Sequence, residues 1–159
     1  MNAGHARGLR VACTLKPDLL QKALVDNCGM SEECTEELLA GFCQLSVLRQ
    51  LVLRRTAIGM SCLPYLSNLV ANIFPSNLAV LKIENCRINA RTTLGICNML
   101  KERCYVRCLA LVRVAFESES ITAFCEYLSK KPYVEDLDLS DNRLSPKQFF
   151  PILEALSRL

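Results

Sequence analysis

The sequence lacks the residues that most catalytic mechanisms need. It contains no tryptophan and a single histidine, and aromatic residues make up only 6% of its 159 positions. The histidine, His5, lies in a segment that we expect to be a flexible tail, so a serine or cysteine nucleophile has no imidazole base. The six glycines are scattered and form no Walker-type phosphate loop. We therefore predict that the protein is not an enzyme.

The sequence also lacks long apolar runs. No window approaches the roughly 18 consecutive apolar residues that a membrane-spanning helix needs. The first residues, MNAGHARGLRVACTLKPDLLQ, contain no apolar segment long enough for a secretory signal. We therefore expect a cytoplasmic protein with no membrane insertion, whose thiols stay reduced.

A strong excess of one charge is absent as well. Lysine and arginine total 19 and the acidic residues 16, which gives a formal net charge of +3. That excess is too small to indicate a nucleic-acid or membrane surface. The basic residues are not interleaved with the aromatic side chains that stack on bases. We therefore expect the partners to be proteins and not nucleic acids.

Cysteine, in contrast, is abundant, with ten residues. The closest pair, Cys104 and Cys108, has no second pair and no histidine nearby, which argues against a zinc site. Cys97 and Cys125 recur at one position of the repeat described below, as do Cys34 and Cys62 at another. A shared position indicates a shared packing role, so we expect small apolar core residues and no metal or cofactor.

One pattern of apolar residues recurs along the chain. In VEDLDLSDNRLS, Val134, Leu137, Leu139 and Leu144 follow steps of three, two and five, which fits neither a plain strand nor a helix. Similar series start at residues 20, 48, 78 and 106, at intervals of 28, 30, 28 and 28. A repeat of this length is one supersecondary unit that cannot bury its apolar face alone.

Each unit is predicted to contain a strand, a turn and a helix. The central xLxL forms the strand and directs two aliphatic side chains into the core. A small residue three positions later closes the turn, and the five such residues are Cys28, Thr56, Cys86, Val114 and Asn142.

The last unit, SPKQFFPILEALSRL, has the clearest helix signals. Ser145 and Gln148 form a capping box, and Pro146 suits the first helical position. Pro151 is expected to tighten or bend the first turns. Four residues are expected to share one apolar face: Phe149, Ile152, Leu153 and Leu156.

The five copies of LxxLxLxx(N/C)xL resemble those of leucine-rich-repeat proteins, and the 28-residue units resemble the ribonuclease-inhibitor type. The chain departs from that pattern at Ala23, Thr56 and Val114, and it carries two extra residues that we place near FPSN, residues 74 to 77. The resemblance implies an α/β solenoid of about five strand–helix units, with parallel strands on the concave face and helices on the convex face. Residues 1–19 would form an N-terminal tail or cap, with a short helix starting in TLKPDLL, and residues 20–159 the repeat domain.

The resemblance also implies that a partner binds the concave strand face. In the repeat frame, Arg54, Arg55 and Lys82 form a basic middle, and Asp136, Asp138 and Asp141 form an acidic end. Between them lies an exposed apolar strip of Val52, Val80, Cys108, Ala110 and Val112. Asp26, Arg54 and Glu84 are expected to form a charge ladder across repeats. The alternative is that the small residues only accommodate curvature. The candidate binding residues are Val52, Arg54, Arg55, Val80, Lys82, Glu84, Cys108, Ala110, Val112, Arg113, Asp136, Asp138 and Asp141.

The C-terminal edge is a second candidate interface. LEALSRL follows the last repeat helix directly, and no polar capping unit comes after it. We expect Phe150, Leu153 and Leu156 to be partly exposed there. Mean hydropathy is positive, at +0.21, so either a longer chain or a protein partner is expected to cover this edge.

The predicted function is a non-catalytic protein-interaction module, a scaffold or adaptor subunit of a larger assembly. The fold class alone suggests a cytoskeletal or ciliary setting by analogy. The resemblance leaves two alternatives open. One is a regulator of a small GTPase, with Arg54, Arg55 and Arg113 as candidate arginines, and the other is a ligand-sensing module of a longer receptor of the innate-immune type.

Overall fold

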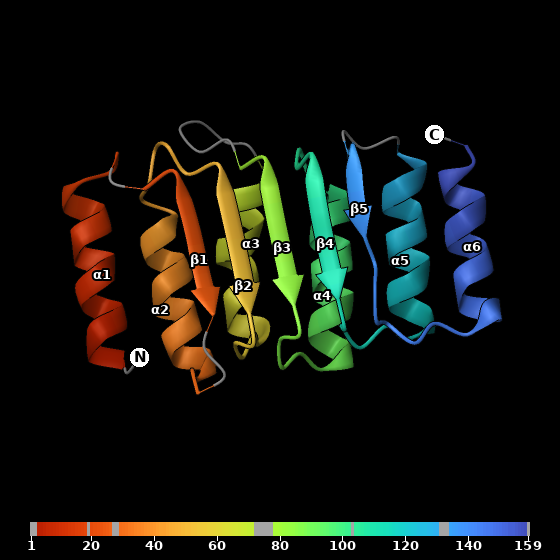
Figure 1. Ribbon diagram of the computed structural model, residues 1–159, viewed down its shortest axis with the longest axis horizontal. Coiled ribbons are helices and arrows are strands. Elements are labelled where there is room, and N and C mark those ends of the chain that lie inside the picture. Colours follow the sequence, from red (N-terminus) through yellow and green to blue (C-terminus); the bar gives the residue numbers. More distant parts are fainter. Residues whose placement is uncertain are drawn as a thin grey trace.

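The computed structural model describes residues 3–18, 20–26, 29–71, 78–102, 104–130 and 134–158. These residues form one parallel five-stranded sheet whose strands lie in sequence order, β1 to β5. Helices alternate with the strands along the chain (Figure 1). The strands are β1 (Lys22–Asp26), β2 (Gln50–Arg54), β3 (Val80–Glu84), β4 (Cys108–Val112) and β5 (Asp136–Asp138). The helices are α1 (Ala3–Leu15), α2 (Glu32–Phe42), a 3-10 turn (Met60–Cys62), α3 (Leu63–Val70), α4 (Ala90–Glu102), α5 (Ser118–Ser129) and α6 (Pro146–Leu156).

The register of the sheet confirms the alignment of the repeats. Each strand begins two residues after the start of its repeat. Leu51 pairs with Leu81, Leu81 with Leu109, and Leu109 with Leu137, so equivalent residues of successive units lie side by side. Parallel neighbours require a long crossover between them, which α2 to α5 supply. The two-residue insertion that we placed at residues 74 to 77 lies outside the described residues.

The core lies between the sheet and the row of helices. Figure 1 shows the described helices on one side of the sheet, with the strands in front of them. The two aliphatic residues of each strand point to the helical side, and they are fully buried in β2, β3 and β4: Leu51, Leu53, Leu81, Ile83, Leu109 and Leu111. Burying a side chain of this size contributes about 1.5–3 kcal/mol, so this double row of aliphatics is a large part of the folding free energy.

The turns after the strands repeat as well. A residue with left-handed backbone follows β2, β3 and β4 directly, and an equivalent one stands in the turn after β5: Arg55, Asn85, Arg113 and Asp141. The next position is the predicted turn residue. Thr56 and Cys86 are buried there, with Thr56 Oγ1 3.4 Å from Cys86 Sγ. Cys28, the first residue of this series, lies outside the described residues.

The N-terminal segment differs from the prediction. His5 lies in helix α1 and not in a flexible tail. The helix expected to start in TLKPDLL is also wrong, because α1 ends at Leu15, within that stretch. Helix α1 packs on α2 through the buried side chains of Ala6 and Cys13. These residues and Leu9 recur at helical spacing, but their small size makes the pattern weak in the sequence.

The N-terminal cap of α6 agrees with the prediction from the sequence, but the buried face of this helix differs from the predicted one. The backbone N–H of Ser145 donates to Gln148 Oε1 at 3.0 Å, as in the predicted capping box. Ile152 and Ala155 are buried, whereas Phe149 and Leu153 are exposed. The predicted apolar face is therefore wrong for those two residues, because helix α5 covers a narrower stripe of α6 than its apolar residues span.

Candidate protein-binding surfaces

The predicted concave-face residues lie together on the face of the sheet opposite the helices, which we call the open face. Val52, Lys82, Ala110 and Asp138 form one row across four strands. Val80, Cys108 and Asp136 form the row before it, and Arg54, Glu84 and Val112 the row after it. Arg55, Arg113 and Asp141 stand in the turns that follow. The sequence placed all of these residues correctly relative to one another, because register follows from the repeat.

The apolar strip on the open face is not exposed as predicted. Val52 is 5% exposed, Ala110 1% and Val112 9%, and only Val80 and Cys108 keep part of their surface accessible. Neighbouring strands lie about 4.8 Å apart, so longer side chains in adjacent rows cover small ones. The strip therefore fills space within the sheet face and offers a partner little apolar surface.

The basic middle of the open face is largely neutralised by ion pairs. Arg54 Nε donates to a carboxylate oxygen of Glu84, and Arg55 Nε donates to Asp26 Oδ1 at 2.6 Å. The hydrogen bond from Arg55 holds the pKa of Asp26 below its ordinary value. The predicted charge ladder is thus confirmed between Arg54 and Glu84, whereas Asp26 pairs with Arg55 and not with Arg54. Because both arginines already face carboxylates, they attract an acidic partner less than their number suggests.

The acidic end of the open face is built from residues of β5 and the turn after it. Cys108 Sγ donates to Asp136 Oδ2 at 3.2 Å, and the backbone N–H of Ser140 donates to Asp138 Oδ1 at 2.9 Å. The hydrogen bonds from Ser140 lower the pKa of Asp138, so this group stays ionised. Asp141 Oδ2 lies 3.9 Å from Arg113 Nη2. The open face therefore presents charge, mainly carboxylates, at its β5 end.

The outer surface of α6 is the most apolar exposed surface among the described helices. Phe150 is 68% exposed, Leu153 46% and Phe149 43%, and the three side chains lie within two turns of one helix. Leu156 is half-buried against the core. The predicted exposure of Phe150 and Leu153 at this edge is confirmed. Phe149 joins them, although the sequence assigned it to the buried face.

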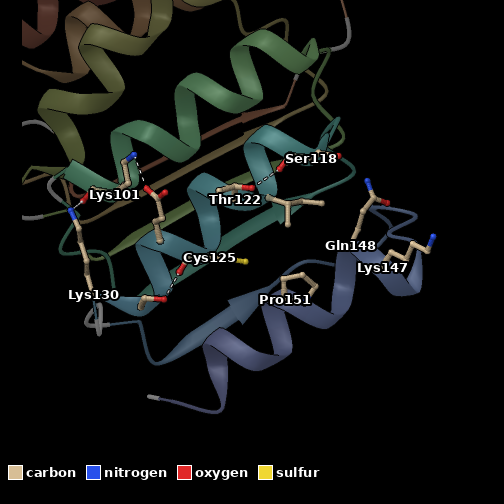
Figure 2. Close-up of a pocket in the computed structure, with 11 residues that line it drawn as sticks. Lys101, Ser118, Thr122, Cys125, Lys130, Lys147, Gln148 and Pro151 are labelled. Carbon is tan, nitrogen blue, oxygen red and sulfur yellow. Dashed lines mark hydrogen bonds and ion pairs between the residues drawn. The ribbon is translucent and has the colours of Figure 1, made fainter.

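A groove of about 770 Å³ lies between α5 and α6, and no pattern in the sequence indicated it. Figure 2 shows Lys101 and Lys130 at one end and Lys147 at the other, with Cys125 pointing toward Pro151. Lys101 Nζ lies 2.9 Å from Glu126 Oε2, and Lys130 Nζ donates to the Lys101 carbonyl at 3.0 Å. Two of these three lysines are thus held by the protein itself. A groove between packed helices depends on their spacing, which no local pattern encodes.

Burial raises the pKa of several thiols among the described residues. Burial raises the pKa of Cys43 to about 11 and that of Cys97 to about 12, so both stay protonated at neutral pH. Burial and the charge of Glu154 raise the pKa of Cys125 in the groove. No group of three or more histidine, cysteine or acidic side chains in the described part of the chain could hold a metal ion.

Two further observations concern membranes and known proteins. In the described part of the chain, no helix combines the length and apolar character that crossing a bilayer requires. No protein-family model matches the chain, and no curated protein matches it either. Function is therefore inferred from the surfaces described above.

Proposed function

We propose that this protein is a leucine-rich-repeat solenoid of the ribonuclease-inhibitor type and acts as a non-catalytic protein-interaction module. Three features support the repeat type. The first is the interval of 28 or 30 residues, the second is the in-register parallel sheet, and the third is the buried turn residue after each of several strands. In this proposal the open face is the concave face, and the helices form the convex face.

The binding function is inferred mainly from three exposed apolar side chains on α6, those of Phe149, Phe150 and Leu153. Covering one such side chain contributes about 1.5–3 kcal/mol, and three on one helix form a contiguous apolar surface. Aromatic residues are also enriched among those that dominate binding energy at interfaces. The outer surface of α6 is therefore the principal interface, in place of the strip on the open face.

The acidic end of the open face is a secondary contact surface in this proposal. Asp136, Asp138 and Asp141 lie on β5 and in the turn that leads to α6, so one partner can reach both surfaces. Charges at the rim of an interface affect orientation and association rate more than affinity. The ion pairs of Arg54 and Arg55 favour a scaffold or adaptor over a regulator of a small GTPase acting through those arginines. We also propose that the protein belongs to a large cytoplasmic assembly, cytoskeletal or ciliary, and this part of the proposal rests only on analogy with proteins of similar fold.

The test is affinity purification of the tagged protein from its native cells, comparing wild type with Phe150→Glu/Leu153→Glu. We expect stoichiometric protein partners with wild type and their loss with the α6 variant. Leu15→Glu is the matched control, because Leu15 is also an exposed leucine on an outer helix. Both variants should keep the wild-type circular dichroism spectrum and urea midpoint, since exposed positions change stability little. Partners that stay bound to the α6 variant but are lost with Asp136→Lys/Asp138→Lys would show that the open face is the principal interface.

A further inference from the structure

Helix α6 presents opposite faces to the protein and to solvent. Its buried face contains Ile152 and Ala155, which pack toward α5. The exposed face contains a stripe at steps of four, three and four along the helix: Pro146, Phe150, Leu153 and Ser157. In the heptad notation of coiled coils, Phe150 and Leu153 are a and d positions. Such a stripe is the pattern with which one helix packs along another.

We propose that the outer surface of α6 binds α6 of a second copy of this chain, with the two helices antiparallel about a two-fold axis. The inference rests on the proposed function, because it names the partner for that same surface. A two-fold interface requires a self-complementary surface, in which residue i contacts residue j and j contacts i. Helix α6 meets this requirement on both flanks of its stripe.

The apolar residues pair in an antiparallel arrangement. With Phe150 opposite Leu153 of the second copy, the symmetry places Leu153 opposite Phe150 of the second copy. On one flank, Phe149 then faces Leu156 of the second copy, and this contact also occurs twice. Every large apolar side chain that α6 exposes is covered in this arrangement.

The charges select the antiparallel direction. Lys147 and Glu154 lie seven residues apart on the flank of α6 that borders the groove with α5. In an antiparallel pair, Lys147 faces Glu154 of the second copy, and the same ion pair forms again on the other side of the axis. A parallel pair would instead place Glu154 beside Phe149 of the second copy, and neither Lys147 nor Glu154 would form an ion pair across the interface. The antiparallel arrangement is therefore favoured.

Glu154 also has a partner within its own helix. Its Oε1 accepts a hydrogen bond from Arg158 one turn later, and both side chains are more than half exposed. An exposed pair of this kind is weak, and it engages only one of the two carboxylate oxygens. The contact with Arg158 is therefore compatible with a second ion pair from Glu154 to Lys147 of the second copy.

The other exposed apolar helix surface is less suitable for this role. On α1, Val11 and Leu15 are exposed, but the same face continues into Gly4 and Gly8 and so offers little side chain to bury. The arginines of α1 are engaged with another helix of the chain: Arg7 pairs with Glu33, and Arg10 pairs with Glu37. Helix α1 therefore lacks a large apolar stripe with which to bind a second copy.

The size of the interface sets its expected strength. Helix α6 has 11 residues, which at 1.5 Å per residue is a contact about 16 Å long. One helix of this length covers a smaller area than the roughly 800 Å² per partner of a standard interface. We therefore expect a dissociation constant in the micromolar range.

The first experiment is sedimentation velocity of the purified chain over a dilution series around roughly 1–100 µM. We expect a monomer–dimer equilibrium in wild type, dimerisation at least about 100-fold weaker in Phe150→Glu, and no change with Leu15→Glu. A wild-type chain that is monomeric at every concentration overturns the inference. In that case the proposed function still stands if Phe150→Glu/Leu153→Glu releases a different protein in the affinity purification, and it fails too if nothing is released.

The second experiment tests the direction of pairing. Lys147→Glu alone places two carboxylates together at each of the two symmetric contacts, and Glu154→Lys alone places two lysines together there. Each variant should dimerise about ten-fold more weakly than wild type. An equimolar mixture should form a mixed dimer more tightly than either variant dimerises alone, because both contacts of the mixed dimer join a carboxylate of one variant to a lysine of the other.

Discussion

Asn142 is joined to Val114 across 28 residues, through a hydrogen bond of 2.7 Å from the Val114 backbone N–H to Asn142 Oδ1. The side-chain amide of Asn142 also donates to the carbonyl of Leu111 at 2.6 Å and to that of Leu139 at 2.7 Å. Valine occupies the equivalent position one unit earlier and has no polar group for its own turn. One asparagine therefore serves the backbone of two successive turns and couples the last unit to the one before it.

We expect Asn142→Ala to destabilise the fold by about 2 kcal/mol or more, because it leaves three backbone groups of two adjacent turns without a partner. The measurement is the midpoint of urea unfolding followed by circular dichroism. Asn98→Ala is the control, since Asn98 lies within α4 and alanine is the better helix former there. Equal midpoints for Asn142→Ala and wild type would mean that water replaces these hydrogen bonds.

The sheet could be predicted from the sequence because its determinants are local and repeated. Each xLxL places two aliphatics on one face, and five copies in phase set both strand position and register. The helices between the strands could be predicted from amphipathic segments. The cap formed by Ser145 and Gln148 could be predicted because it needs particular residue types three positions apart. The same frame brought the candidate residues of the open face into neighbouring rows.

The exposure of individual residues could not be predicted in the same way. Ala110 looked accessible in the repeat frame and is buried, because coverage depends on the lengths of neighbouring side chains. Phe149 looked buried and is exposed, because α5 contacts only one stripe of α6. Helix α1 contains no copy of the repeat, so the alignment of the repeats could not predict which of its residues are buried. Such outcomes depend on tertiary packing, which overrides local pattern.

The packing of α1 on α2 depends on the absence of a side chain at Gly41. A Cβ added at Gly41 would lie 2.9 Å from the Cα of Arg10, which is backbone and cannot rotate away. We expect Gly41→Ala to displace α1, at a cost of about 1–3 kcal/mol that exceeds the gain in helix propensity. Hydrogen exchange of the α1 amides should become faster in this variant.

Gly8→Ala provides the matched comparison on α1. A Cβ at Gly8 would meet none of the described atoms within 4 Å. This substitution should therefore stabilise α1 by up to about 1 kcal/mol through helix propensity and slow its exchange. If both alanines slow exchange equally, close approach of α1 and α2 at Gly41 is not required for packing.

The ion pair of Arg107 with Glu135 should give the fold a small dependence on acid. Arg107 Nε donates to Glu135 Oε1 at 3.0 Å and Nη2 donates to Oε2 at 2.7 Å, which holds the pKa of Glu135 below its ordinary value. Because the folded pKa is the lower one, the stabilisation is complete above the ordinary value and is lost as the pH falls through the folded pKa. Carboxyl NMR titration should show the pKa of Glu135 rising to its ordinary value in Arg107→Gln. The pKa of Asp26, whose partner is Arg55, should not move. A depressed pKa of Glu135 that persists in Arg107→Gln would exclude the ion pair as its cause.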